Sequence, residues 1–562
     1  MSFFRTPVSV AVARLAAVLL GLNACGGGSP SPPPTASYSL AATALNPASI
    51  AAGNTSTSTI TLSPAGGYAG SVTLSCAAIS GANAPACSFS LNPVPVSGGG
   101  TSTLTVSTTI NTPGGNYSIS IAGKDANNLA ASNGSQSLTL TAAAVIQHVV
   151  VIFQENRTPD NLFQDPVLIA RGADIAQQGK SSSGQTITLA PIDLGTAGSN
   201  PQNYDLSHAH SAFVSMYDGG KMDGADKIPC GPAAQCPPNA HPNPQFKYVI
   251  QSDVTPYFGM AEQYTFGDRM FQTQQGPSFP AHQFIISGTS APTATSNLFA
   301  SENPHVPTAG AVVGCTAPAG EFVLLIDPTG AENSSQFPCF EHPTLVDELD
   351  AKSVTWKYYT PTPGSIWTGP NAIQHLRMGP DWTNNVITPS TQILTDITNG
   401  QLAEVSWVIP TAAASDHASS NDGSGPSWVA SIVNAVGNSQ YWSSAAILIT
   451  WDDWGGWYDH VAPKITNSYE YGFRVPLIVV SPFAKPAYVS HVTHDFGSIL
   501  KFIEEVFQVP TLGYADTPAD DLSDCFDLTR TPGPFQFITA PRDATFFLND
   551  KRPPAGPDND DL

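Results

Sequence analysis

Apolar and polar residues follow different patterns in the two parts of this chain. From about residue 37 to 142, short runs such as STSTITLSP and STLTVST alternate apolar and polar positions, and Gly, Asn and Pro lie between the runs. Alternation with a period of two is typical of strands that bury one face. Because helical spacing is almost missing here, this part is predicted to form an antiparallel β-sandwich.

From residue 145 onward the apolar runs are longer and continuous, and helical patterns lie between them. Apolar residues recur at helical spacing over 427–439 and 495–507, which predicts two helices. Continuous runs of Val, Ile and Leu favour strands covered on both faces, and strands that alternate with helices indicate a mostly parallel α/β sheet. We expect its strands at 148–153, 283–287, 353–359, 403–408, 445–450 and 475–480.

The chain has 562 residues, which predicts more than one domain. An insertion around 160–270 is rich in Gly, Asn, Pro and His, and such a segment usually builds the substrate side of a cleft. The polar end of the chain is expected to be disordered. The predicted order is a signal peptide at 1–24, a Gly/Ser/Pro linker at 25–36, the β-sandwich at 37–142, the α/β domain at 145–545 and a disordered tail at 546–562.

The first 24 residues resemble a bacterial export signal that ends in a lipobox. Arg5 and Arg14 precede or enter the apolar stretch VARLAAVLLGL, and the sequence LNAC ends at Cys25. The apolar run is short for a membrane span and ends in small residues, as secretory signals do. The resemblance implies cleavage before Cys25 and a lipid anchor on its thiol, hence a bacterial lipoprotein at the cell envelope. A plain secretory signal with an incidental cysteine, giving a secreted protein, is the alternative.

The charge balance argues against polyanion binding as the main task. The formal net charge is −22, and loss of Arg5 and Arg14 with the signal would change it to −24. With so few Lys and Arg residues, the chain has no basic stripe to neutralise a nucleic-acid backbone. We therefore expect no nucleic-acid partner.

Export would permit disulfide bonds between the cysteines that follow Cys25. Three pairs of these cysteines lie close together in the sequence, which leaves Cys525 without a nearby partner. Cys525 is therefore either a small buried apolar residue or wrongly excluded from a pair. The pattern C-x-x-C is absent, so no zinc knuckle is expected. Local spacing suggests Cys76 with Cys87, Cys230 with Cys236, and Cys315 with Cys339.

Two of the predicted strands end in pairs of metal-binding residues. Glu155 and Asn156 follow one strand, and Asp452 and Asp453 follow another. Ligands of parallel sheets bind beyond the carboxyl ends of the strands. Neighbouring side chains on a strand point to opposite faces, so the Asp pair requires a bend, which Gly455 makes plausible. Three carboxylates and one amide oxygen favour one divalent cation of unknown identity. The alternative is a helix-capping Glu155 and a solvated Asp loop.

Ser278, in the segment QQGPSFPAHQFIISGTS, is the candidate nucleophile. Gly276, Pro277 and Pro280 fix its turn. A serine hydroxyl is a poor nucleophile at neutral pH, but a neighbouring metal ion can lower its pKa and orient it. The alternative is an ordinary serine in a Pro-rich turn.

With these motifs, residues 145–530 resemble the bacterial phosphoesterase family of phosphatidylcholine-type phospholipases C and acid phosphatases, within the alkaline phosphatase superfamily. The resemblance implies an alkaline phosphatase-like three-layer α/β sandwich, and 37–142 resembles the immunoglobulin-like modules of exported proteins. The matching segments are HVVVIFQENRTPDNLF, DLSHAHSAF with DGGKMDG, GPSFPAHQFIISGTS, ASDHASSNDG, TWDDWGGWYDHVAP, and YGFRVPLIVVSPFAK with HVTHDFGSILKFIEE.

The same resemblance assigns roles to individual residues. Many family members have Asn-Arg where this chain has Ala281-His282, so His282 either replaces the arginine as a substrate-binding group or only packs. Histidines suit hydrogen bonding to phosphoryl oxygens or protonation of a leaving group, although a lone histidine is often structural. The implied metal ligands are Glu155, Asn156, Asp452 and Asp453, the nucleophile is Ser278, and the further catalytic candidates are His208, His417 and His460.

These observations predict a metal-dependent hydrolase of phosphoric esters, in the form of an acid phosphatase-like phosphomonoesterase that acts through a phosphoserine. The expected partners are a small phosphate ester or a phospholipid headgroup. A phospholipase C acting on phosphatidylcholine-type lipids and an inactive surface binding protein remain alternatives. The GPSFPAHQF and WDD segments favour the phosphatase branch, and the missing arginine argues against a sulfatase.

Overall fold

The computed structural model describes residues 35–552, except for 82–83, 110–111, 113, 144, 196–203, 232–235, 237–241, 306–311, 529 and 531. The predicted signal peptide with its cleavage site at Cys25, the linker up to residue 34 and the last ten residues of the predicted tail lie outside the described residues. In that described part, none of the helices has the length and apolar character that a membrane span requires.

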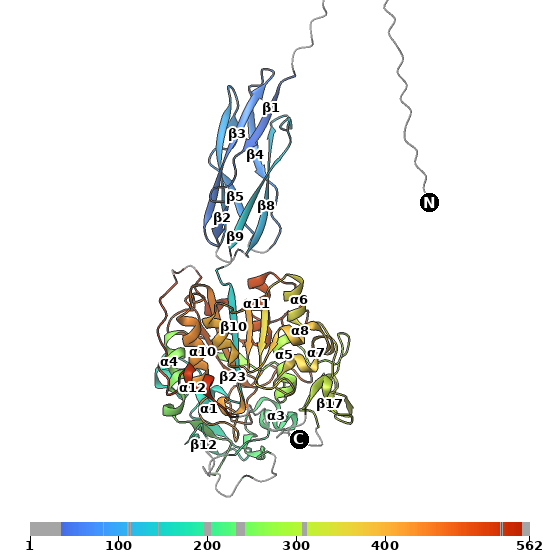
Figure 1. Cartoon of the computed structure of the whole chain (residues 1–562), viewed down its shortest axis with the longest axis vertical. Coiled ribbons are helices and arrows are strands. Elements are labelled where there is room, and N and C mark those ends of the chain that lie inside the picture. The colour runs from blue at the N-terminus through green and yellow to red at the C-terminus, as the bar shows by residue number, and fades with distance from the viewer. Residues whose placement is uncertain are drawn as a thin grey trace, which may run out of the picture.

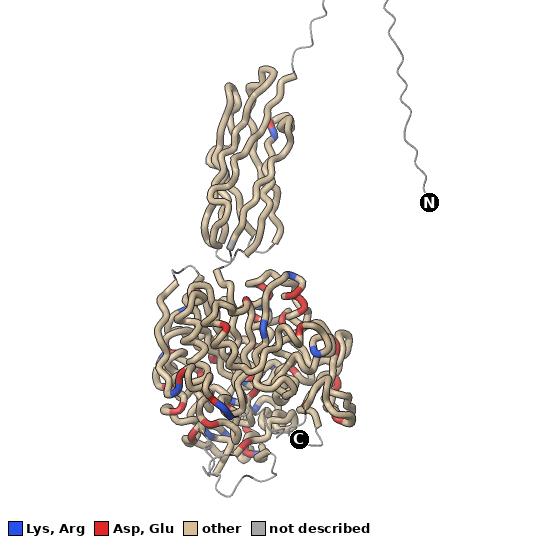
Figure 2. The backbone as a smooth tube through the Cα atoms, in the orientation of Figure 1, with Lys and Arg blue, Asp and Glu red and all other residues tan. Residues whose placement is uncertain are grey.

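Residues 37–143 fold into two facing β-sheets, which form an elongated body in Figure 1. Apolar residues alternate with polar ones along each strand, and the inward side chains form a core of their own that includes Tyr38, Leu40 and Ile60. Lys124 and Asp125 are the only charged residues here, as Figure 2 shows. One sheet contains β1 (Ser37–Ala42), β3 (Thr55–Ala65), β7 (Gly100–Ser107) and β5 (Ala86–Phe89), and the other β2 (Ser49–Ala51), β9 (Gln136–Ala143), β8 (Gly115–Asp125), β4 (Ser71–Cys76) and β6 (Val94–Pro95).

The remaining elements form a mixed α/β fold around one large sheet. Strand β10 has parallel neighbours on both sides, whereas β23 is antiparallel to both of its neighbours. The strands β10, β22 and β23 are almost completely buried, as their continuous apolar sequences predict. The order across the sheet is β20 (Val386–Ile387), β19 (Trp356–Tyr359), β21 (Val405–Val408), β10 (His148–Gln154), β22 (Ala445–Trp451), β23 (Arg474–Val480), β15 (Thr265–Phe271) and β24 (Tyr488–Ser490), with β25 (His494–Asp495) also paired to β15.

Helices cover both faces of this sheet (Figure 1). Helix α10 (Gly425–Gly437) packs against α4 (Gln251–Gln263), α9 (Gln392–Thr398) and α12 (Ala544–Asn549). On the other side α11 (Phe496–Phe507) packs against α5 (Ser278–Ser287) and α6 (Leu345–Ala351). The shorter elements are α1 (Pro159–Leu162), α2 (Pro166–Ala170), α3 (His210–Tyr217), α7 (Gln374–Met378), α8 (Pro380–Asn384), β11 (Gln178–Lys180), β12 (Thr186–Thr188), β13 (Ala190–Ile192), β14 (Lys247–Val249), β16 (Phe299–Ala300), β17 (Val323–Ile326) and β18 (Ser334–Gln336).

Two local expectations are wrong. The strand predicted at 283–287 is the second half of helix α5, in which all ten residues are buried. Burial on all sides removes the helical spacing of apolar residues, so the run Phe-Ile-Ile does not distinguish a helix from a strand. The tail predicted from 546 starts too early, because 546–549 belong to α12, where Phe547 is buried. The helices predicted at 427–439 and 495–507 are confirmed as α10 and α11.

The cysteine pairing is confirmed. Disulfides join Cys76 to Cys87, Cys230 to Cys236 and Cys315 to Cys339. The thiol of Cys525 is free and buried, so this cysteine packs as a small apolar residue.

Candidate functional site

The site is built where two neighbouring parallel strands end. Gln154 of β10 lies opposite Trp451 of β22, so the residues that follow both strands leave the sheet at the same level. The amide of Asn156 donates a hydrogen bond to Asp452 Oδ1 over 3.2 Å, which ties one strand end to the other. We call the four residues that follow the two strands the strand-end residues; they are Glu155, Asn156, Asp452 and Asp453, and all four are fully buried.

The bend expected after the Asp pair is present at Gly455, whose φ is +63°. A Cβ on Gly455 would overlap the carbonyl oxygen of Asn156 and lie 2.8 Å from its Cβ, so only glycine fits here. Asn156 itself also has a positive φ of 63°. The two turns are therefore in direct contact, and this contact brings both pairs of side chains to one place.

Ser278 is the first residue of helix α5 and is 1% exposed. Its Oγ lies 3.5 Å from Glu155 Oε2 and donates a long hydrogen bond to it. The preceding turn is tightly packed, since a Cβ on Gly276 would overlap Ser301 O and Tyr469 Oη. The structure thus brings the predicted nucleophile to the strand-end residues.

His282 lies one helical turn after Ser278, on the same side of α5. Its Nε2 is 3.3 Å from Glu155 Oε1 and 3.9 Å from Asp452 Oδ2. Its Nδ1 is 3.2 Å from the hydroxyl oxygen of Tyr358. Burial lowers the pKa of His282 to about 4, although the charge of Asp452 opposes this.

The charges of the strand-end residues fit a bound cation. Burial raises the pKa of Glu155 well above its ordinary value, and the charges of Asp452 and Asp453 raise it further. Asn156 Oδ1 and Asp452 Oδ2 are buried without a hydrogen-bond partner among the described residues. Buried oxygens of this kind are costly unless something compensates them, and a hard divalent cation does so. One oxygen each of Glu155 and Asp452 and one nitrogen of His282 lie within 4.8 Å of one another.

His208 orients the amide of Asn156. The ring Nδ1 lies 2.9 Å from the carbonyl oxygen of Leu206, which can only accept, so Nδ1 carries the proton. Nε2 therefore accepts from Asn156 Nδ2 over 2.8 Å, and this fixes which end of the Asn156 amide is the nitrogen and which is the oxygen. His208 Nε2 also lies 4.0 Å from Asp453 Oδ2. The ring centroids of His417 and His208 are 6.0 Å apart, so these two predicted catalytic histidines are neighbours in the site.

His460 takes part in a different ion-pair cluster. Its Nδ1 lies 2.8 Å from Asp160 Oδ2 and its Nε2 lies 2.9 Å from Asp174 Oδ1. Burial lowers its pKa, but the hydrogen bond and charge of Asp160 outweigh this and raise the pKa to about 9. Arg474 completes the cluster through Asp459. Both ring nitrogens are engaged there, which favours a structural role for His460.

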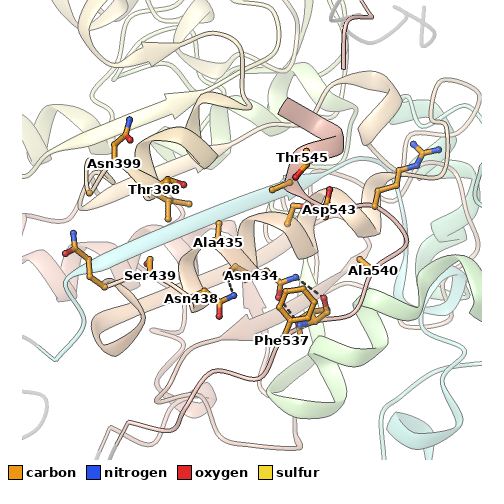
Figure 3. Close-up of a pocket in the computed structure, with 17 residues that line it drawn as sticks. Thr398, Asn399, Asn434, Ala435, Asn438, Ser439, Phe537, Ala540, Asp543 and Thr545 are labelled. Atoms are coloured by element: carbon orange, nitrogen blue, oxygen red, sulfur yellow. Dashed lines mark hydrogen bonds between the residues drawn. The ribbon is translucent and has the colours of Figure 1, made fainter. Parts of the chain in front are cut away.

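A surface pocket of about 810 Å³ lies against helices α9, α10 and α12 (Figure 3). Amide and hydroxyl groups such as those of Asn399, Asn434 and Thr545 line it, together with Phe537. None of the residues that line it belongs to the predicted site. This pocket is therefore separate from the strand-end residues.

Two residues of the site were not predicted from the sequence. Tyr358 lies in β19 and contacts His282, but in the sequence it is one aromatic residue in an apolar strand. Gln274 donates a hydrogen bond from Nε2 to the carbonyl oxygen of Asp452 over 3.2 Å. The Gln-rich run QTQQG, which overlaps the start of the nucleophile segment, is the one signal that could have pointed to it.

Known proteins match most of this chain. The sequence model of the Phosphoesterase family matches residues 146–510. The non-hemolytic phospholipase C of Pseudomonas aeruginosa is 23% identical over 418 residues, covering 65% of this chain and 54% of that protein. Phospholipase C B of Mycobacterium tuberculosis is 23% identical over 452 residues, covering 69% of this chain and 79% of that protein. The chain thus spans about half the length of the Pseudomonas relative and more of the mycobacterial one.

Proposed function

The chain belongs to the Phosphoesterase family, and from this premise we propose that it hydrolyses phosphoric esters with Ser278 as nucleophile and one divalent cation held by the strand-end residues. The observation that carries the proposal is the hydroxyl of Ser278, 3.5 Å from Glu155 in a buried set of carboxylate and amide oxygens. When bound, the cation would supply a lowered serine pKa and neutralise charge on the phosphoryl group.

In the proposed reaction, Ser278 Oγ forms a bond to phosphorus while the bond from phosphorus to the alcohol oxygen breaks. The hydroxyl proton leaves Oγ, and Glu155 Oε2 is the acceptor that faces it. The amino end of α5, a helix of 10 residues, points its backbone N–H groups toward the new phosphoserine and favours its negative charge. Water then attacks phosphorus and gives one proton to the histidine that protonated the alkoxide. The bond from phosphorus to Ser278 Oγ breaks, Glu155 returns its proton to Oγ, and phosphate leaves.

His208 and His417 lie on the Asn156 side of the site. In our proposal His208 holds the Asn156 amide, because both of its ring nitrogens are hydrogen-bonded, and His417 donates the proton to the departing alkoxide. A residue of this kind typically contributes about 100-fold or more to the rate. The predicted catalytic role of His460 is not part of the proposal, because its ring nitrogens bond to Asp160 and Asp174.

The substrate we propose is a small phosphate monoester, in line with an acid phosphatase-like enzyme. A specific observation favours phospholipid headgroups as the second candidate: the relatives from Pseudomonas aeruginosa and Mycobacterium tuberculosis are named phospholipases C. An inactive binding protein is disfavoured, since the nucleophile and all four strand-end residues are present and close together.

Three further features belong to the same proposal. The mixed sheet with helices on both faces supports an alkaline phosphatase-like three-layer sandwich. The two facing sheets of 37–143 support an immunoglobulin-like module, with a spacer role between the enzyme and an anchor. The lipobox supports a lipid anchor at Cys25 and a place at the cell envelope.

The test is hydrolysis of p-nitrophenyl phosphate and of phosphatidylcholine by the purified protein and by its Ser278→Ala variant. We expect the variant to lose at least about 1,000-fold in kcat and to keep one equivalent of metal. Ser287→Ala is the matched control, because Ser287 is a buried serine at the other end of the same helix. Hydrolysis by Ser278→Ala at more than a tenth of the normal rate would exclude Ser278 as nucleophile. The ratio of the two substrates separates a phosphatase from a phospholipase C.

A further inference from the structure

The hydrogen bonds of Tyr358 determine which nitrogen of His282 carries its proton. The Tyr358 hydroxyl lies 2.9 Å from the carbonyl oxygen of Trp367, which can only accept, so the single hydroxyl proton goes there. The hydroxyl oxygen accepts from the amide of Gly369 over 3.3 Å. His282 Nδ1, at 3.2 Å, must therefore be a second donor to this oxygen. The proton of a neutral His282 is on Nδ1.

Nε2 of His282 then presents a lone pair to two carboxylates. It lies 3.3 Å from Glu155 Oε1 and 3.9 Å from Asp452 Oδ2, and all three side chains are fully buried. When Glu155 is ionised, the lone pair and the two carboxylates face each other with no donor between them, and Asp452 Oδ2 has no hydrogen-bond partner among the described residues. Such an arrangement is stable when an electron-pair acceptor lies among the three atoms.

The geometry suits a metal ion as that acceptor. The nitrogen and the two oxygens lie within 4.8 Å of one another, as ligands bonded at about 2 Å to a common ion do. Metal-bound histidines commonly donate their other ring N–H to an oxygen, which fixes the tautomer and the ring. Tyr358 provides that oxygen. Ser278 and His282 are one turn apart on α5, so the helix that carries the nucleophile also brings the nitrogen to the carboxylates.

We propose that His282 binds the catalytic cation through Nε2, with Tyr358 as the residue that positions it, and that the site therefore takes a first-row transition metal in preference to Mg²⁺ or Ca²⁺. An imidazole ligand favours Zn²⁺, Fe²⁺ or Ni²⁺, whereas oxygen-only sites suit Mg²⁺, Ca²⁺ and Mn²⁺. The inference rests on the metal site of the proposed function. It places His282 with the cation instead of with the substrate phosphate, the role expected from the sequence.

The experiment is pulsed electron paramagnetic resonance on the full protein, stripped with chelator and reloaded with one equivalent of Mn²⁺. We expect electron spin-echo modulation from a directly bound ¹⁴N nucleus, and its loss in His282→Gln. The matched control is His342→Gln, since His342 is also buried and lies against α5 but bonds to Ala291 and Ser287. The control should keep the modulation. Tyr358→Phe should also keep it, with Mn²⁺ affinity lowered about tenfold or more.

Calorimetric titration gives the second readout. His282→Gln should lower the affinity for Zn²⁺ by at least about 100-fold while the affinity for Mg²⁺ changes less than about tenfold. Absence of ¹⁴N modulation in the unaltered protein would overturn the inference, and so would modulation that persists in His282→Gln but disappears in His208→Gln.

The two proposals fail separately. A protein that hydrolyses phosphate esters with Mn²⁺ but shows no nitrogen coupling keeps the proposed function and loses this inference. Nitrogen coupling at His282 in a protein whose Ser278→Ala variant stays active keeps this inference and removes Ser278 as the nucleophile of the proposed function.

Discussion

Replacement of Asp452 by Asn tests the charge of the site without changing its shape. Asp452 Oδ1 accepts from the amides of Asn156 and Asp453, and an Asn side chain keeps this acceptor. The other oxygen, Oδ2, has no hydrogen-bond partner among the described residues, and in Asn an amino group with two donors takes its place. The variant therefore removes one negative charge and adds a donor where the native residue lacks one.

The magnitude follows from the distance between charges. The ligand atoms of Glu155 and Asp452 lie within 4.8 Å of each other, and two ionised carboxylates at that distance repel by about 3.5 kcal/mol at an effective dielectric constant of about 20. Protonation of Glu155, whose pKa burial and the charge of Asp452 raise, relieves part of this repulsion. In the absence of metal, Asp452→Asn should raise the free energy of unfolding by up to this amount. With saturating metal, the native protein should be the more stable one, because the variant has lost a charged ligand.

The assay is chemical denaturation of both proteins at pH 8, in chelator and in excess divalent cation. The account predicts that the order of stability reverses between the two conditions. Asn434→Ala, a change on helix α10 beside the pocket of Figure 3, should shift stability equally in both. If Asp452→Asn were less stable than the native protein in chelator by the same amount as in metal, the reasoning about crowded carboxylates would be refuted.

Three further predictions concern a turn at the site and two ion-pair clusters. Gly455→Ala should destabilise the protein by about 1–3 kcal/mol and weaken metal binding, because its φ of +63° and its contact with Asn156 exclude a Cβ; native-like metal titration would contradict this. His460→Gln should lower the stability of the fold and change kcat less than about tenfold. A large loss of kcat at unchanged stability would show that His460 has a catalytic role. The hydrogen bond that the His375 ring donates to Asp347 raises the pKa of His375 from 6.5 to about 9. The charged ring therefore stabilises the fold fully below pH 6.5 and loses this effect as the pH rises through 9. His375→Gln should cost on the order of 1 kcal/mol at pH 6 and almost nothing at pH 10, measured by urea unfolding.

The strands of the large sheet could be predicted because complete burial leaves a clear signal. The runs HVVVIF and AAILIT are continuous and apolar, and both are strands covered on two faces. The run FIIS has the same character but belongs to a helix, since α5 is also buried on every side. Burial alone does not distinguish the two, and the antiparallel direction of β23 depends on chain path and not on composition.

The chemistry of the site was visible in residue types, and its geometry was not. The strand-end residues come together because β10 and β22 pair in parallel register, which the sequence indicates only through two similar strands. The contact of His282 with Glu155 depends on where α5 meets the sheet, and Tyr358 reaches the site from a third strand. His460 looked equivalent to the other histidines, but only the folded chain shows its bonds to Asp160 and Asp174.

The most direct test of the central claim is anomalous diffraction from crystals of the protein loaded with Mn²⁺. The account predicts one strong peak among Glu155, Asn156, Asp452 and Asp453, within bonding reach of the side chain of Ser278. A peak elsewhere, or a peak at the strand ends with the serine hydroxyl turned away from it, would contradict the account.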